Sequence, residues 1–407
     1  VIELLFVLVN IRSMETADLD VMSFPAIHRQ MRIAVVTETY PPDVNGVALT
    51  LRRVVEGLQG IGHDVFLVRP RQSKDARAGD PSHELLVQGM PIPMYPALKI
   101  GFPAKRALVK LWISRRPDLV HIATEGPLGW SAIQAAKKLR IPMTSDFRTN
   151  FHAYSAFYGF RWMKSTIFSY MKKFHNATQC TMVPTAELKE TLAGLGFHRL
   201  MVIPRGIDTQ LFDPSRRSEA LRRSWGASAA TCVLLSVGRL AAEKNLTLIL
   251  KVFHQARIQN PDIRLVFVGD GPLKEKLVAQ CPEAIFCGVQ HGEALAAHYA
   301  SGDIFLFPSL TETFGNVTLE ALASGIAVVA FDCAGARQLI SSDVSGILLP
   351  PQDESSFVER SIRLAQDANQ RNRLGMAARQ VSLENQWATV VKRTEAVMLQ
   401  VLADRTS

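Results

Sequence analysis

Two glutamates and a glycine–asparagine pair share one short segment that is suited to an anionic ligand. Residues 312–325 read ETFGNVTLEALASG and follow an apolar strand candidate. Gly315 and Asn316 are expected at a helix N-terminus, where free backbone N–H groups and the helix dipole favour a phosphate. Glu312 precedes this helix and Glu320 lies just over one turn along it, so both carboxylates are expected to face one ligand. On their own, two such acids are also compatible with solvated surface charges.

A second segment carries two cations at the end of a strand candidate. Residues 236–245 read SVGRLAAEKN, so Arg239 and Lys244 leave the strand together. Cations in this place can neutralise a diphosphate leaving group, although an Arg/Lys pair in a loop is often only solvated. The turn at 269–271 (GDG) follows the next strand, and its glycines allow a close backbone approach or a positive φ.

Polar segments also follow strand candidates in the first half of the chain. Residues 37–47 (TETYPPDVNGV) form an irregular loop that ends at Gly46 near a helix start, which again favours an anion. Residues 145–154 (SDFRTNFHAY) place Arg148 and His152 among aromatic side chains. A lone histidine in such a setting is often structural, and His152 is therefore only a candidate for the site.

Short apolar runs alternate with helical patterns from residue 32 onward and must position these segments. This alternation is typical of parallel α/β sheets, in which ligands bind at the carboxyl ends of the strands. We predict two doubly wound, Rossmann-like domains that face each other across a cleft. The expected divisions are an extension (1–30), an N-terminal domain (31–205), a linker (206–228), a C-terminal domain (229–383) and a final amphipathic helix (384–407). The expected strands are 33–37, 65–69, 119–123, 141–145, 180–183 and 201–203, then 232–237, 263–268, 285–287, 304–307, 326–330 and 347–349.

Composition is typical of a globular protein with more than one core. The chain has 407 residues, of which 47% are apolar and 20% charged. Its net charge of +9 suits anionic ligands or an anionic membrane surface. The five cysteines include no Cys-x-x-Cys pair, which favours buried thiols in a reducing, cytoplasmic compartment. No apolar run approaches the roughly 20 residues that cross a bilayer. Residues 1–30 precede the fold pattern, and we expect a non-native or disordered extension that is dispensable.

From residue 31 onward, the sequence resembles the retaining GT-B glycosyltransferases of family 4, nearest the α-mannosyltransferases and glycolipid hexosyltransferases. The resemblance rests on the segment at 312–325, with its two glutamates and Phe-Gly pair, and on the Gly-Arg…Lys-Asn segment at 238–245. It implies that the C-terminal domain binds a nucleotide sugar and that the final helix packs back on the N-terminal, acceptor-side domain. The implied donor contacts are Arg239 and Lys244 as the pyrophosphate clamp, Glu312 on the transferred sugar, Glu320 on the ribose, Gly315 and Asn316 on the diphosphate, and Gly46, Gly271, Val289 and Phe314 around the donor.

This sequence departs from the family pattern at Arg148, where many relatives have a histidine close to the reacting carbon. His152 is the candidate for that catalytic position, with a purely structural histidine as the alternative, and we expect Arg148, His121 and Glu125 to lie on the acceptor side. Outside the extension there is no Asp-x-Asp pair, so no obligatory metal or other cofactor is expected.

The resemblance implies transfer of a mannose- or glucose-type hexose, with retention, from a GDP- or UDP-linked donor to a lipid or glycan hydroxyl. Two basic amphipathic patterns, 104–116 and 160–174, are compatible with peripheral binding to an anionic membrane surface or with packing on the sheet. No nucleic-acid partner is expected. A nucleotide-sugar epimerase on the same architecture and a non-catalytic nucleotide-sugar or membrane-binding module are the alternatives.

Overall fold

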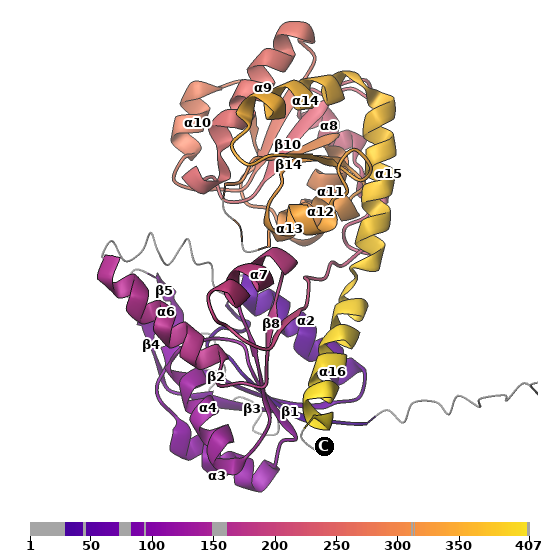
Figure 1. Ribbon diagram of the computed structural model, residues 1–407. Coiled ribbons are helices and arrows are strands. Elements are labelled where there is room, and N and C mark those ends of the chain that lie inside the picture. Colours follow the sequence, from indigo (N-terminus) through magenta and orange to yellow (C-terminus); the bar gives the residue numbers. More distant parts are fainter. Residues whose placement is uncertain are drawn as a thin grey trace, which may run out of the picture.

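In the computed structural model the chain folds into two lobes, each built on a parallel β-sheet, and the predicted fold class is confirmed (Figure 1). The structure describes residues 29–43, 46–72, 83–92, 95–148, 161–310, 312 and 314–404. His152 and nearly all of the predicted extension at 1–30 lie outside the described residues. Among the helices in these ranges, none is long and apolar enough to cross a membrane.

The first lobe contains a seven-stranded sheet in the order β3-β2-β1-β6-β7-β8-β9, and every neighbouring pair is parallel. Its strands are apolar because helices cover both faces, as in other parallel sheets. The strands are β1 (Arg32–Val36), β2 (Asp64–Pro70), β3 (Glu84–Val87), β6 (Leu119–Ile122), β7 (Met143–Asp146), β8 (Cys180–Val183) and β9 (Leu200–Val202). The helices are α2 (Gly46–Gly60), α3 (Lys105–Arg115), α4 (Pro127–Leu139), α6 (Arg161–His175) and α7 (Ala186–Gly194).

The second lobe repeats this plan with a six-stranded parallel sheet in the order β12-β11-β10-β13-β14-β15. Its strands lie between two apolar clusters, one on each face. The strands are β10 (Val233–Val237), β11 (Arg264–Val268), β12 (Ile285–Phe286), β13 (Ile304–Phe307), β14 (Ala327–Phe331) and β15 (Ile347–Leu349). The helices are α9 (Leu246–Gln259), α10 (Lys274–Gln280), α11 (Gly292–Ser301), α12 (Asn316–Ala323), α13 (Ala334–Leu339), α14 (Glu354–Gln366) and α15 (Ala368–Glu384).

The strand orders fix where ligands are expected. In the first sheet the chain winds outward through β1, β2 and β3 and then returns to β6 beside β1; in the second, β13 returns beside β10 in the same way. Loops that leave two such strands diverge to opposite faces and open a crevice at their carboxyl ends. The loops after β10 and β13 are those that contain Arg239, Lys244, Glu312 and Gly315.

Two chain segments connect the lobes, and much of the segment expected as a linker is ordered on the second lobe. Residues 206–228 include a 3-10 turn, η1 (Pro214–Arg216), and a helix, α8 (Glu219–Ser224). The guanidinium of Arg222 is fully buried and donates to Ser301 O at 2.9 Å and to Asp303 Oδ2 at 2.9 Å. These bonds hold α8 on the second lobe, whereas Ile207 N donates to Asn385 O at 3.0 Å in the returning segment.

The final helix, α16 (Trp387–Ala403), lies on the first lobe, although it follows α15 of the second lobe (Figure 1). Val391, Met398 and Leu402 are buried among residues of β1, β2 and α2. Helix α2 approaches closely, since a Cβ built at Gly57 would lie 2.3 Å from a Val391 methyl. The final helix thus begins at Trp387, three residues later than predicted, because Glu384 is the last residue of α15; α16 then returns the chain to the first sheet.

Candidate active site between the lobes

A cavity of about 500 Å³ lies where the carboxyl edges of the two sheets face each other. The two sides approach closely, because a Cβ built at Gly46 would lie 4.0 Å from the side-chain nitrogen of Asn316. The first lobe contributes Thr39, Gly46, Val47, Thr50, Arg148 and Arg205 to its lining, and the second lobe contributes Lys244, Glu312, Phe314, Gly315, Asn316 and Val317. The cavity therefore unites predicted donor residues with the predicted acceptor-side residue Arg148.

Helix α12 presents its N-terminus to this cavity. Gly315 precedes the helix with φ +85°, a left-handed conformation that favours glycine, and the Phe307 ring lies 3.4 Å from the position of a Cβ. Within the described residues, the backbone N–H groups of Gly315, Asn316 and Val317 have no hydrogen-bond partner. Free N–H groups at a helix N-terminus, together with the helix dipole, suit a phosphate oxygen.

Lys244 and Glu312 form an ion pair inside the cavity. The Lys244 ammonium also lies over the Phe307 ring, 5.3 Å from its centre, and Ser309 Oγ donates to Glu312 at 3.1 Å. Leu310 N donates to Glu243 O at 3.0 Å, which fastens the loop after β13 to the loop after β10. A diphosphate at the α12 N-terminus would thus meet an ammonium group that is already held in place.

Arg239 is exposed two residues beyond β10, and it lines a small cavity together with Lys244. The neighbouring glycine turn is required by packing, because a Cβ at Gly271 would lie 2.5 Å from Leu240 O. At Gly269, φ is +140° and a Cβ would lie 1.9 Å from Gly238 O. Only glycines allow the two loops to lie against each other, so Gly271 positions the Arg239 loop and does not line the larger cavity.

Glu320 lies one turn beyond Val317 on α12 and outside the residues that line the cavity. Its Oε2 accepts from the Tyr299 hydroxyl at 2.8 Å. Burial raises the pKa of Glu320, while the Tyr299 hydrogen bond partly opposes that shift. The hydrogen bond leaves Oε1 for a ligand hydroxyl. Val289, at the end of β12, is 56% exposed and also stands outside the cavity lining.

On the first lobe, Arg148 is held by a buried network. Its Nε donates to Asp146 Oδ2 at 2.8 Å, and that oxygen lies 3.3 Å from Nε2 of His121, whose Nδ1 contacts Thr144 Oγ1 at 2.9 Å. Burial alone would raise the pKa of Asp146, but the neighbouring Arg148 and His121 hold it well below its usual value. His121 is buried behind the cavity and acts on Arg148 through Asp146, whereas the sequence led us to expect it on the acceptor side.

Arg205 lines the cavity next to this network, and it was not among the residues that the sequence predicted for the site. It follows β9 by three residues. Burial, and then the charge of Arg148, lower its pKa from 12.5 to about 9. Its place at the carboxyl end of a parallel strand was the available signal, because ligands gather there.

Two further carboxyl groups follow strands of the first sheet, Glu38 after β1 and Glu125 after β6. Glu38 accepts from Leu128 N at 2.9 Å at the start of α4, and Glu125 Oε1 lies 3.4 Å from His175 Nε2. Burial raises the pKa of Glu38 to about 7, against the effect of the Leu128 hydrogen bond. Neither residue lines the cavity. Glu125, which we expected on the acceptor side, thus contacts His175 of α6 and stands outside the cavity lining.

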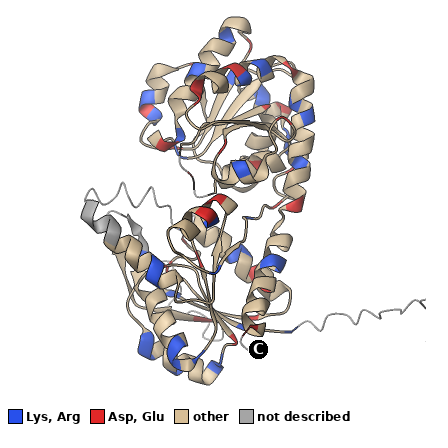
Figure 2. Ribbon diagram, in the orientation of Figure 1, with Lys and Arg blue, Asp and Glu red and all other residues tan. Residues whose placement is uncertain are grey.

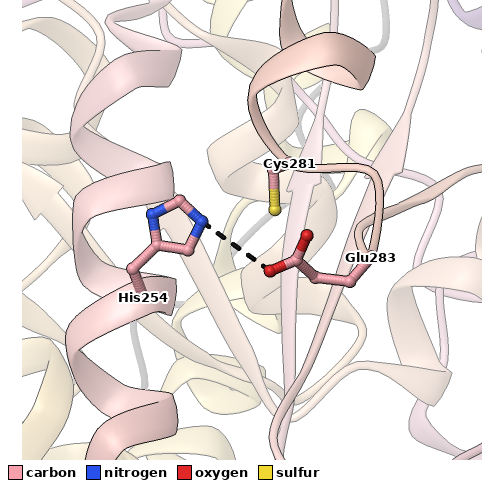
Figure 3. A group of neighbouring side chains, drawn as sticks. All are labelled: His254, Cys281 and Glu283. Atoms are coloured by element: carbon pink, nitrogen blue, oxygen red, sulfur yellow. Dashed lines mark ion pairs between the residues drawn. The ribbon is translucent and has the colours of Figure 1, made fainter.

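A group of metal-ligand type is formed by His254 of α9 with Cys281 and Glu283, which lie between α10 and β12 (Figure 3). In the described part of the chain, His254, Cys281 and Glu283 have ligand atoms within 4.8 Å of one another. Glu283 already accepts from Arg257 Nη1 at 3.0 Å, and burial, with the charge of Glu283, raises the pKa of Cys281 to about 11. The group precedes β12, whereas the cavity lies at the carboxyl ends of the strands. It is therefore separate from the candidate active site.

Comparison with known proteins gives consistent matches over nearly the whole chain. Residues 44–211 match the family described as Glycosyltransferase Family 4, and residues 217–381 match Glycosyl transferases group 1. A GDP-mannose-dependent alpha-mannosyltransferase of Mycolicibacterium smegmatis is 33% identical over 88% of this chain and 95% of its own length. The alpha-monoglucosyldiacylglycerol synthase of Streptococcus pneumoniae is 27% identical over 78% and 75%. The structure of Anabaena HepE in complex with UDP has a TM-score of 0.73 at 17% identity, over 91% of this chain and 100% of that one.

Proposed function

The chain belongs to the family 4, group 1 glycosyltransferases and is a nucleotide-sugar hexosyltransferase, and on this premise we propose that the cavity between its lobes carries out the transfer. The observation that carries the proposal is the convergence of Lys244, Glu312 and the free N–H groups of α12 on one cavity that both lobes line. This set of groups provides positive charge for a diphosphate and a carboxylate for sugar hydroxyls.

The donor diphosphate is proposed to lie against the α12 N-terminus. Arg239 and Lys244 neutralise its charge, and Glu312 exchanges its ion pair with Lys244 for hydroxyl groups of the hexose. Glu320, with one oxygen on Tyr299, holds the ribose hydroxyls with the other. These positive and polar groups are fixed before the reaction, so little reorganisation is needed as charge develops on the leaving group.

Transfer with retention requires the acceptor hydroxyl to approach C1 from the face that the diphosphate leaves. A bond from the acceptor oxygen to C1 forms while the bond from C1 to the β-phosphate oxygen breaks, and a β-phosphate oxygen takes the acceptor proton. The products are the glycoside and a nucleoside diphosphate. Stabilisation of the departing negative charge is then the main catalytic task, and Arg239 and Lys244 perform it without an obligatory metal ion. We also propose that His152, which lies outside the described residues, contacts the donor near the reacting carbon.

We propose a GDP- or UDP-linked hexose as the donor and a lipid or glycan hydroxyl as the acceptor. The named activities of the relatives support this choice, since they include GDP-mannose-dependent mannosyl transfer and monoglucosyldiacylglycerol synthesis. Incubating the full chain with GDP-mannose, UDP-glucose and related donors plus a lipid extract, followed by mass spectrometry, tests the proposal. We expect a lipid with one added hexose and release of one nucleoside diphosphate. Conversion of the donor without a new glycoside would instead support an epimerase or a hydrolase, and binding without any turnover would support the non-catalytic module.

Membrane association is a further part of the proposal, at the cytoplasmic face of an anionic membrane. The apolar residues Leu108 and Trp112 of α3 pack into the core, so this helix offers its charged face to a partner. Basic residues of α3 and α4 gather at one end of the first lobe (Figure 2). Lys105 and Lys110 are exposed there. We expect the protein to sediment with phosphatidylglycerol vesicles. Added salt, or a change of both lysines to glutamine, should weaken this binding. Equal binding to phosphatidylcholine vesicles would contradict the proposal.

A further inference from the structure

The first-lobe side of the cavity carries more positive charge than its own carboxylates neutralise. Arg148 and Arg205 both line the cavity, and Asp146 is the carboxylate that acts on both guanidinium groups. Of the two arginines, only Arg148 donates hydrogen bonds to Asp146. Two guanidinium groups therefore share one carboxylate, which leaves one positive charge without compensation.

Both guanidinium groups also have unused hydrogen-bond donors. Arg205 makes no hydrogen bond or ion pair with any residue that the structure describes. Nη1 of Arg148 is buried and likewise has no partner within the described ranges. A buried donor without a partner costs free energy, and more so when it is charged. Burial and the charge of Arg148 accordingly lower the pKa of Arg205 to about 9.

The arrangement is prepared for an oxyanion. The Asp146–His121 network fixes the plane of the Arg148 guanidinium, so little side-chain entropy remains to be lost on binding. Planar guanidinium groups bind carboxylate, phosphate and sulfonate oxygens through paired N–H donors. An anion between Arg148 and Arg205 would use the unpaired donors and relieve the repulsion between the two cations.

The second lobe already supplies a separate set of groups for the donor diphosphate. Arg239, Lys244 and the α12 N–H groups follow β10 and β13, whereas Arg148 and Arg205 follow β7 and β9 of the other sheet. An anionic group bound by the first-lobe arginines is thus carried most simply by the second substrate.

We infer that the acceptor bears an anionic group, a carboxylate or a phosphate, close to the hydroxyl that receives the hexose, and that Arg148 and Arg205 bind this group. The inference rests on the proposed function, because it takes the cavity as the site of transfer. Arg205 selects acceptors that carry a negative charge. Arg148 stands where many relatives have a histidine, which can be neutral or protonated, and it supplies a cation that stays protonated.

The test uses the full chain saturated with GDP or UDP, whichever binds, so that the diphosphate site is filled. Calorimetric titrations with inorganic phosphate and, separately, with glucuronate distinguish a phosphate-bearing from a carboxylate-bearing acceptor. We expect at least one anion to bind and to bind about 10- to 100-fold more weakly in Arg205→Gln, because a charge-assisted pair is lost. Arg205→Lys, which keeps the charge but not the paired donors, is expected to retain intermediate affinity. Arg223→Gln removes one positive charge from an exposed position of α8 and is the matched control. This variant is expected to bind the anion like the wild type.

Two further measurements separate this role from others. Affinity for the nucleotide is expected to stay within about twofold of wild type in Arg205→Gln. The melting temperature is expected to stay equal or rise, since a half-buried charge without a partner among the described residues is removed. A fall in melting temperature would indicate a structural role and overturn the inference. It would also be overturned if neither anion bound the nucleotide-saturated protein, or if Arg205→Gln weakened the nucleotide tenfold. Binding of neither GDP nor UDP would contradict the proposed function itself.

Discussion

Replacing Glu38 with glutamine should make the stability of the first lobe less dependent on pH. Glu38 is only 9% exposed, and its Oε1 accepts from Leu128 N at the start of α4. Burial raises its pKa from 4.5 to about 7. The folded protein therefore holds this proton more tightly than the unfolded chain, and the carboxylate form is penalised.

The sign and size of the effect follow from the raised pKa. Below pH 4.5 the Glu38 carboxyl is protonated in both states and no penalty exists; the stability is lost as pH rises through the window from 4.5 to about 7. A tenfold difference in proton affinity between the folded and unfolded states corresponds to about 1.4 kcal/mol, so the loss across the window is about 3 kcal/mol in the free energy of unfolding. Glutamine keeps the shape and one acceptor oxygen but does not titrate.

Urea unfolding at pH 5 and pH 8 gives the change in the free energy of unfolding between the two pH values. This change is compared between Glu38→Gln and the wild type. The wild type should lose about 2.5 kcal/mol more than the variant between these two pH values, because part of the loss has already occurred at pH 5. Glu56→Gln removes an exposed carboxylate of α2 and is the matched control, which should keep the wild-type dependence. Equal pH dependence in Glu38→Gln and wild type would refute the assignment of a buried, titrating carboxyl.

Four other perturbations test the site and the architecture. Glu312→Gln should chiefly lower kcat and Glu320→Gln should raise the donor KM, each by roughly 10- to 150-fold, because a charge-assisted hydrogen bond is lost; wild-type kinetics in both would remove these residues from the site. Turnover should persist in EDTA, since cations and N–H groups neutralise the diphosphate; loss of turnover that magnesium or manganese restores would contradict this. Deletion of residues 384–407 removes α16, which buries Val391 and Leu402 on the first lobe. The truncated protein should therefore be insoluble or inactive. A soluble truncated protein with unchanged kcat/KM would contradict an architecture in which α16 is needed by the first lobe.

The sequence allowed the fold and the second-lobe site to be predicted because their signals are local. The strand 304–307 and the strand 347–349 occur as predicted, since each is an apolar run bounded by turn residues. Gly315 at the start of α12 was also readable, because the helical pattern begins directly after it. The antiparallel pair β4 (Gly89–Ile92) and β5 (Tyr95–Gly101) was missed, since prolines interrupt its apolar pattern.

The contacts that could not be predicted join residues distant in sequence. Tyr299 meets Glu320 from another helix, and Arg205 reaches the cavity from the end of the last strand of the first sheet. Likewise, His121 looked like a site residue because it stands on a strand at the cleft. Only the register of β6 against β7 places it opposite Thr144 and behind Asp146. Pairing across strands decides whether such a side chain meets a ligand or supports a neighbour.

The anomeric configuration of the product tests the central claim most directly, because same-face transfer in the cavity requires retention. With an α-linked nucleotide sugar that supports turnover, the glycoside should be analysed by NMR from early time points, with the one-bond carbon–proton coupling at C1 identifying the anomer. We predict an α-glycoside as the first product in wild type, and the same anomer, formed more slowly, in Lys244→Gln. A β-glycoside would show attack from the face opposite the diphosphate and would contradict the proposed chemistry of the cavity.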